Sequence, residues 1–186
     1  MEWIWRPNSE SLGNDTQIFT HVLYNHYSSP DNLDFDVIDN NMHAWINDES
    51  SEDYSAPDLA KVLIPQLEDR AKHYLTTDIM LLFGGDFEYM NAAYNYQQMD
   101  RMIEYMNKHH GDRYNFRYST PSDYVDAVSR HQIKWPTKYD DMFPYSDNPD
   151  SYWTGYFTSR ANDKEQIRRG SSNFHASSQL YSQSVL

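Results

Sequence analysis

The stretch TDIMLLF at residues 77–83 constrains the fold of this chain more than any other. Its apolar residues are consecutive instead of alternating, which is typical of a parallel strand covered on both faces. The run ends at Gly84-Gly85-Asp86. In α/β proteins, sites are built outside the carboxyl ends of such strands. The stretch therefore predicts both a buried strand and a candidate site at its end.

Helical and extended patterns alternate along the chain. Apolar residues repeat at helical spacing after the cap residue Ser55, from about 91 to 109, and from Thr120 to about 130. The remaining β-type patterns lie at 2–5, 17–24 and 113–119. This alternation predicts an α/β fold with a parallel sheet or barrel.

Three details refine this prediction. Pro65 interrupts the first helical pattern, so we expect a kink or break there. Methionines at helical spacing in 91–109 predict a core-facing stripe and no cofactor site. The acidic, polar residues 34–54 predict a surface excursion or a poorly ordered insert.

Composition excludes several classes of function. The net charge of −13 disfavours nucleic acid and anionic membrane surfaces as partners. The chain has no cysteine, so a disulfide, a thiolate nucleophile and a thiolate metal site are excluded. No apolar run is as long as a membrane span, and no signal peptide precedes the first strand pattern. Aromatic residues make up 16% of the chain, which fits either a core or a sugar-binding surface.

Four residues are candidates for a site. Asp86 could act as a general acid at the end of a buried strand, but Gly-Gly-Asp is also ordinary turn chemistry. Arg6 could hold a ligand oxygen or form an ion pair. Trp153 could stack on a ligand or fill a core, and Tyr27 gives a weaker signal of the same kind.

Two further patterns stand apart from these candidates. His109 and His110 are adjacent at a predicted helix end, where histidine suits the helix dipole, so we expect no metal site there. Residues 158–186 predict a long helix. Its apolar residues recur every seven positions and form a narrow stripe suited to a helical bundle, and these residues are Ile167, Phe174 and Tyr181.

Three stretches resemble the glycoside hydrolase family 38 α-mannosidases of lysosomal and Golgi type. They are MEWIWRP followed by IFTHVLYNHYSSP, then LLFGGDFEYMNAAYN, then YDDMFPYSDNPDSYWTGYFTSR. The resemblance spans residues 1 to about 160 and extends weakly beyond. It implies that 1–157 form the C-terminal part of an α/β-barrel glycosidase domain. Residues 158–186 would then be the first helix of a truncated three-helix bundle.

The resemblance also implies residue roles. Asp86 matches the acid/base of a retaining, zinc-dependent hydrolysis of α-linked mannose. Arg6 matches an arginine near the nucleophile, and Trp153 a tryptophan of the mannose pocket. Tyr27 corresponds to a substrate-contacting tyrosine in a loop that varies across the family.

Departures from the family are equally informative. The zinc-binding His-x-Asp pair and the aspartate nucleophile, in a DPFGHS-like motif, do not occur here, and neither does the HHD-type motif with the fourth zinc ligand. Position 85, an acid in some relatives, is glycine. We therefore expect a fragment that is inactive alone, because retention needs two carboxylates. The alternative is a non-catalytic carbohydrate-binding or interaction remnant.

The expected partners are mannose-containing glycans, and by resemblance the compartment is the lysosome, the vacuole or the Golgi lumen. A barrel without its early strands exposes sheet edges, so we also expect self-association.

Overall fold

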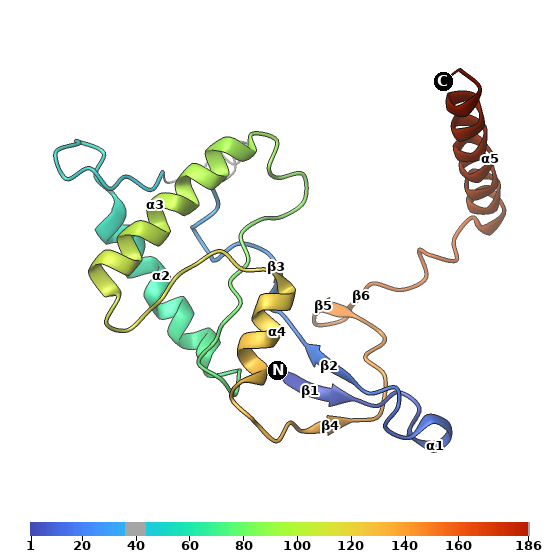
Figure 1. Ribbon diagram of the computed structural model, residues 1–186, viewed down its shortest axis with the longest axis horizontal. Coiled ribbons are helices and arrows are strands. Elements are labelled where there is room, and N and C mark those ends of the chain that lie inside the picture. The colour runs from blue at the N-terminus through green and yellow to red at the C-terminus, as the bar shows by residue number, and fades with distance from the viewer. Residues whose placement is uncertain (36–43, 186) are drawn as a thin grey trace. The chain divides into compact units, whose positions relative to one another are not determined.

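The computed structural model describes residues 1–35 and 44–185 (Figure 1). These residues form two compact units, which are treated separately below. Unit 1 comprises Met1–Tyr139, and unit 2 comprises Asp140–Leu186.

A small mixed sheet lies at the start of unit 1. Strand β1 (Glu2–Trp5) pairs antiparallel with β2 (Ile18–His21) and parallel with β4 (Thr137–Lys138), in the order β2-β1-β4. The short helix α1 (Ser9–Leu12) connects β1 to β2, and β3 (Tyr24–Tyr27) follows. The β1 prediction is confirmed. The predicted 17–24 segment is confirmed as β2 and the start of β3.

Helices α2 (Ala56–Ala71) and α3 (Ala92–His110) carry the main core of unit 1. The expected methionine stripe is confirmed, because Met99, Met102 and Met106 are all buried in this core. Pro65 does not break α2, which spans 16 residues and contains this proline. Proline removes only one helical hydrogen bond, and the burial of Leu63 and Leu67 on either side stabilises the helix.

Helix α4 (Pro121–Ser129) begins as its sequence indicates. The Thr120 hydroxyl accepts a hydrogen bond from the backbone N–H of Asp123, whose carboxylate accepts one from the backbone N–H of Thr120. This reciprocal arrangement satisfies two donors that the first turn of a helix leaves unpaired.

Two predicted strands are wrong. Residues 77–83 and 113–119 form no strand, and the described residues form small sheets and no closed barrel. A strand needs a paired backbone, and both edges of β1 are already occupied by β2 and β4. The mixture of helices and strands agrees with an α/β class, while the barrel remains a prediction.

The expected surface excursion at 34–54 is wrong for Phe35 and Trp45, although residues 48–50, 52 and 53 are exposed. Phe35 and Trp45 are 4% and 0% exposed and belong to the core with α2 and α3. Two large apolar side chains are enough to bury a segment whose other residues are polar, because each gains about 1.5–3 kcal/mol or more from burial. Residues 36–43 of this range lie outside the described residues.

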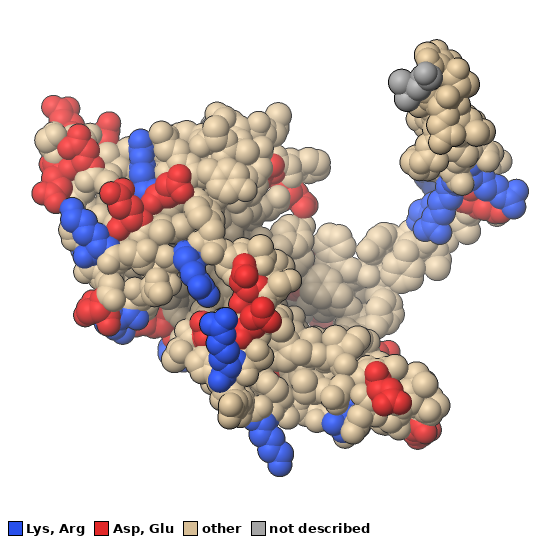
Figure 2. Space-filling model, in the orientation of Figure 1, with Lys and Arg blue, Asp and Glu red and all other residues tan. Residues whose placement is uncertain are grey.

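Unit 2 contains the hairpin strands β5 (Ser146–Asn148) and β6 (Ser151–Tyr152) and the long helix α5 (Ala161–Val185). The predicted terminal helix is confirmed, although it begins three residues later than expected. It has no buried residue. Figure 2 shows its charged side chains gathered at one end, and these are Asp163, Lys164, Glu165, Arg168 and Arg169.

Acidic and basic side chains are interspersed on the face of the molecule drawn in Figure 2. The net charge of −13 is therefore not concentrated in one patch of that face. Within the described ranges, no helix combines the length and the apolar character that crossing a membrane requires.

Candidate active site

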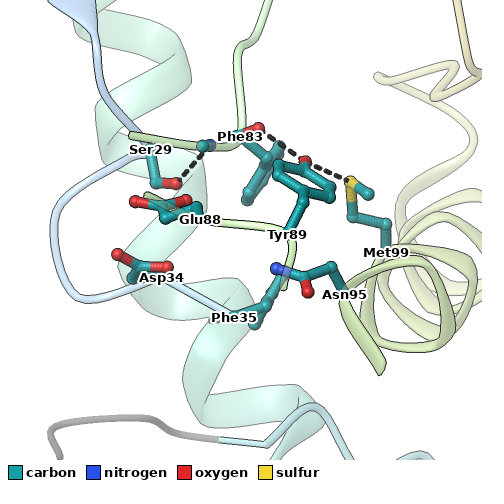
Figure 3. A pocket seen from close by; sticks show the side chains of 9 residues that line it. Ser29, Asp34, Phe35, Phe83, Glu88, Tyr89, Asn95 and Met99 are labelled. Carbon is teal, nitrogen blue, oxygen red and sulfur yellow. Dashed lines mark hydrogen bonds between the residues drawn. The ribbon is translucent and has the colours of Figure 1, made fainter. Parts of the chain in front are cut away.

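The turn that carries Asp86 is held from two sides. Ser29 donates its backbone N–H to the carbonyl of Gly84 (3.1 Å), and its hydroxyl accepts from the N–H of Gly84 (2.8 Å). The Tyr89 hydroxyl donates to the carbonyl of Phe83 (2.6 Å) and lies 4.0 Å from the Met99 sulfur. Figure 3 shows that these groups lie around a small pocket. The pocket leaves no room for a water molecule.

The backbone of this turn is strained. Gly84 has φ +147°, and a Cβ there would come within 3.2 Å of the Tyr89 ring. Phe87 and Tyr89 adopt φ +64° and +63°, which is uncommon for bulky residues. Such conformations cost on the order of 1–3 kcal/mol each and cluster at functional sites. The ordinary solvated turn considered from the sequence needs no strain of this kind.

Asp86 itself is exposed and has one hydrogen-bond partner among residues 1–35 and 44–185. The hydroxyl of Tyr27, at the end of β3, donates to Asp86 Oδ1 at 2.6 Å. The bond fixes one carboxylate oxygen and leaves Oδ2 open to a ligand. The structure therefore brings together two of the four candidate residues, which are 59 positions apart.

Arg6 lies elsewhere in unit 1, directly after β1. Its backbone N–H donates to the carbonyl of Lys138 (2.9 Å), and its guanidinium donates to Gln17 Oε1 (3.1 and 3.2 Å). No ion pair joins Arg6 to Asp86 in the part of the chain that the structure describes. The guanidinium of Arg6 is therefore held by an uncharged partner.

Trp153 belongs to unit 2, where it follows β6. Its backbone N–H donates to the carbonyl of Tyr145 (3.0 Å), and its ring lies edge-on to Tyr156. Hydrogen bonds from Trp153 and Ser151 lower the pKa of Asp147, so the polar edge of the indole is already used. Trp153 remains 53% exposed, so it does not fill a core among the described residues.

Sequence reasoning missed a buried cluster formed by Glu2, His21, Tyr74 and Tyr124, here called the Glu2 cluster. Glu2 Oε1 accepts from the Tyr124 hydroxyl (2.6 Å) and contacts His21 Nδ1 (2.9 Å). The His21 ring stacks on Tyr74, with centroids 4.9 Å apart. A glutamate whose side chain is fully buried at the start of β1 links the sheet to α4. Glu2 occupies an alternating strand position, but no local pattern indicates a partner 122 residues away.

The described residues do not fit a zinc site. Nowhere in residues 1–35 and 44–185 do three histidine, aspartate or glutamate side chains come close enough to hold a metal. The ring of His109 instead stacks on Tyr105 at 4.4 Å.

The sequence matches the family model described as "Glycosyl hydrolases family 38 N-terminal domain" over residues 1–148. This match covers most of the chain. The chain belongs to glycosyl hydrolase family 38. The family assignment agrees with the resemblance described above, and it includes the turn at Asp86.

Relatives in this family are α-mannosidases from distant organisms. The chain is 40% identical over 181 residues to an α-mannosidase of Arabidopsis thaliana and 37% identical over 182 residues to the lysosomal α-mannosidase of Dictyostelium discoideum. Both alignments cover 97% of this chain and 17% of the relative. The human lysosomal α-mannosidase is 33% identical over 162 residues, or 86% of this chain and 16% of that protein. The chain thus spans about one sixth of the length of these relatives.

Proposed function

We propose that this chain supplies the general acid/base half of a retaining α-mannosidase site, with Asp86 in that role. The observation that carries the proposal is the strained turn that holds Asp86 exposed, with Oδ1 bound by Tyr27 and Oδ2 open. Family membership supplies the reaction class, because the matched relatives are α-mannosidases.

In the proposed reaction, Asp86 carries its proton on Oδ2 and donates it to the glycosidic oxygen as the C–O bond to mannose breaks. The resulting carboxylate then takes a proton from the water that releases the sugar. Tyr27 orients the carboxyl group through Oδ1 in both steps. Arg6 and Trp153 are proposed to support the site and to stack on the sugar, respectively, in the assembled enzyme.

The reaction needs a second carboxylate as nucleophile, and the resemblance places it in a motif that this sequence lacks. Zinc, which the resemblance also implies, has no fitting ligand set among the described residues. We infer that this polypeptide is inactive alone and that its substrates in an assembled enzyme are mannose-containing glycans. The lysosomal relatives favour a lysosomal or vacuolar compartment.

The test is an assay of the purified chain with an aryl α-mannoside, with and without added zinc. We expect no turnover above that of an Asp86→Asn variant. Turnover that Asp86→Asn abolishes would show that the chain is a complete catalyst and would contradict this part of the proposal.

A second candidate function is carbohydrate binding without catalysis. The exposed aromatic rings of unit 2 favour it, because Trp153, Tyr152 and Tyr156 are each more than half exposed. Isothermal titration with α-mannosides distinguishes it: binding that Trp153→Ala abolishes and Asp86→Asn leaves unchanged would support a binding module.

A further inference from the structure

The turn between α1 and β2 presents Asn14 to solvent. The backbone N–H of Asp15 donates to the carbonyl of Leu12 (3.1 Å), and that of Gln17 donates to the carbonyl of Asn14 (3.2 Å). Asn14 is exposed, and its side-chain amide makes no hydrogen bond to any other described residue. Figure 1 shows α1 and this turn at the end of the sheet that lies away from α2 and α3. The fold thus holds the main chain of Asn14 and leaves its amide nitrogen available.

Asn14 also begins the triplet Asn14-Asp15-Thr16, which has the form Asn-x-Ser/Thr with a residue other than proline in the middle. This form marks asparagines that accept an N-linked oligosaccharide in the secretory pathway. No other asparagine among the 186 residues stands in such a triplet. Because short triplets also arise by chance, the inference depends on the structure around this one.

The hydroxyl of Thr16 does not help to hold the turn. Its Oγ1 atom is buried, yet it makes no hydrogen bond to any other described residue. A buried hydroxyl without a partner destabilises a fold, so packing alone would favour an apolar residue at this position. The glycosylating enzyme, in contrast, requires a hydroxyl two positions after the acceptor asparagine. The unpaired hydroxyl of Thr16 therefore fits a residue that is recognised before the turn folds.

The surroundings of Asn14 can accommodate a sugar chain. A Cβ placed on the preceding Gly13 would meet no atom within 4 Å, so the described residues do not close over the turn. Two apolar side chains beside it, Leu12 and Ile18, are 48% and 54% exposed. The C–H faces of the first sugars can lie against such side chains and remove apolar surface from water. A glycan here would meet open space and cover exposed apolar groups.

We propose that Asn14 is an N-glycosylation site and that its oligosaccharide is attached before the turn folds. In the transfer, Asn14 Nδ2 forms a bond to the anomeric carbon of an oligosaccharide carried on a lipid diphosphate. The C–O bond to the diphosphate breaks, the lipid diphosphate leaves with the bonding electrons, and a base of the transferase takes one amide proton. The inference rests on one part of the proposed function, the lysosomal or vacuolar compartment, because the route to it passes the lumen that holds this donor.

The site is tested by translating the full chain, with a cleavable leader added, into microsomes that contain the lipid-linked donor. We expect one glycosylated product, which endoglycosidase treatment returns to the unmodified mass. Asn14→Gln and Thr16→Ala should each reduce the glycosylated fraction at least about tenfold, because they remove the acceptor and the hydroxyl, respectively. Thr16→Ser is the matched control, since it keeps a hydroxyl, and should retain the glycan.

The position and the timing have separate readouts. Enzymatic release of the glycan in heavy-oxygen water should convert Asn14, and no other asparagine, into a labelled aspartate. The chain made without microsomes, folded and then offered to the solubilised transferase with its donor, should be glycosylated at least about tenfold less than during translation, because Thr16 Oγ1 is buried in the fold.

Three results would overturn the proposal: no modification in microsomes, a glycan that survives Asn14→Gln, or equal transfer to the folded chain. Mass spectrometry of the protein isolated from its own cells separates the remaining failures. A bare Asn14 there, after modification in microsomes, would overturn the proposal together with the inferred compartment and leave the role of Asp86 untouched. A glycan at Asn14 in an enzyme without α-mannosidase turnover would support this site and count against the proposed function.

Discussion

Replacing Tyr124 with phenylalanine removes one hydroxyl from the Glu2 cluster and leaves the ring in place. That hydroxyl donates at 2.6 Å to Glu2 Oε1, and the Glu2 side chain is fully buried. Tyr124 itself is 6% exposed. Water therefore cannot replace the lost donor without opening the contact between β1 and α4.

The expected cost follows from leaving a buried acceptor without its donor. Removing one partner of a buried hydrogen bond costs about 1–3 kcal/mol, so Tyr124→Phe should lower the free energy of unfolding by about that amount. The matched control is Tyr118→Phe. Tyr118 donates to Asp100 at 2.9 Å but is 52% exposed, so its loss should cost less than about 0.5 kcal/mol.

Urea unfolding at pH 7, followed by circular dichroism, measures both values. We expect a lower midpoint for Tyr124→Phe with an unchanged slope, and little change for Tyr118→Phe. Equal losses in the two variants would refute the claim that the Glu2 cluster holds the sheet to α4.

Three more predictions concern the same unit. Met106→Ala should cost about 2–5 kcal/mol in urea unfolding, because Met106 is fully buried; a loss below about 1 kcal/mol would contradict its place in the core. Burial and the hydrogen bond to Glu2 raise the pKa of Tyr124. The contribution of Tyr124 to the free energy of unfolding is therefore complete below pH 10, the ordinary tyrosine pKa, and is lost as the pH rises further. If stability falls just as steeply at alkaline pH in Tyr124→Phe, this prediction is refuted. Hydrogen bonds from Thr120 lower the pKa of Asp123, so the free energy of unfolding should fall as the pH drops below about 4. Thr120→Ala should make this fall shallower and should cost about 1 kcal/mol at pH 7. A fall as steep as that of the unmodified chain would count against the capping box.

Features set by neighbouring residues were predictable from the sequence. The capping box at Thr120 and the methionine stripe of α3 depend on residues three or four positions apart, and both form as expected. The strand at 77–83 did not form, since pairing depends on a partner that no local pattern can supply.

The candidate site was predictable only in part, for the same reason. Motif resemblance singled out Asp86, Tyr27, Arg6 and Trp153, but the contact between Tyr27 and Asp86 joins positions 59 apart. The strain at Phe87 and Tyr89 had no sequence signal either, because bulky residues are rarely placed at positive φ. These two features give physical content to a role that the motif alone could only suggest.

The most direct test of the acid/base assignment is azide rescue in a chimera. This chain replaces the 182 matched residues of the Dictyostelium enzyme, and Asp86→Ala is assayed with a 2,4-dinitrophenyl α-mannoside. Such a leaving group needs little protonation, so Asp86→Ala mainly slows the second step, in which Asp86 takes a proton from the attacking water. Azide is already an anion and attacks without losing a proton, so it can replace water in that step. The account predicts slow turnover that azide restores, with α-mannosyl azide as the product. Unimpaired turnover of Asp86→Ala, or impaired turnover without azide rescue, would contradict it.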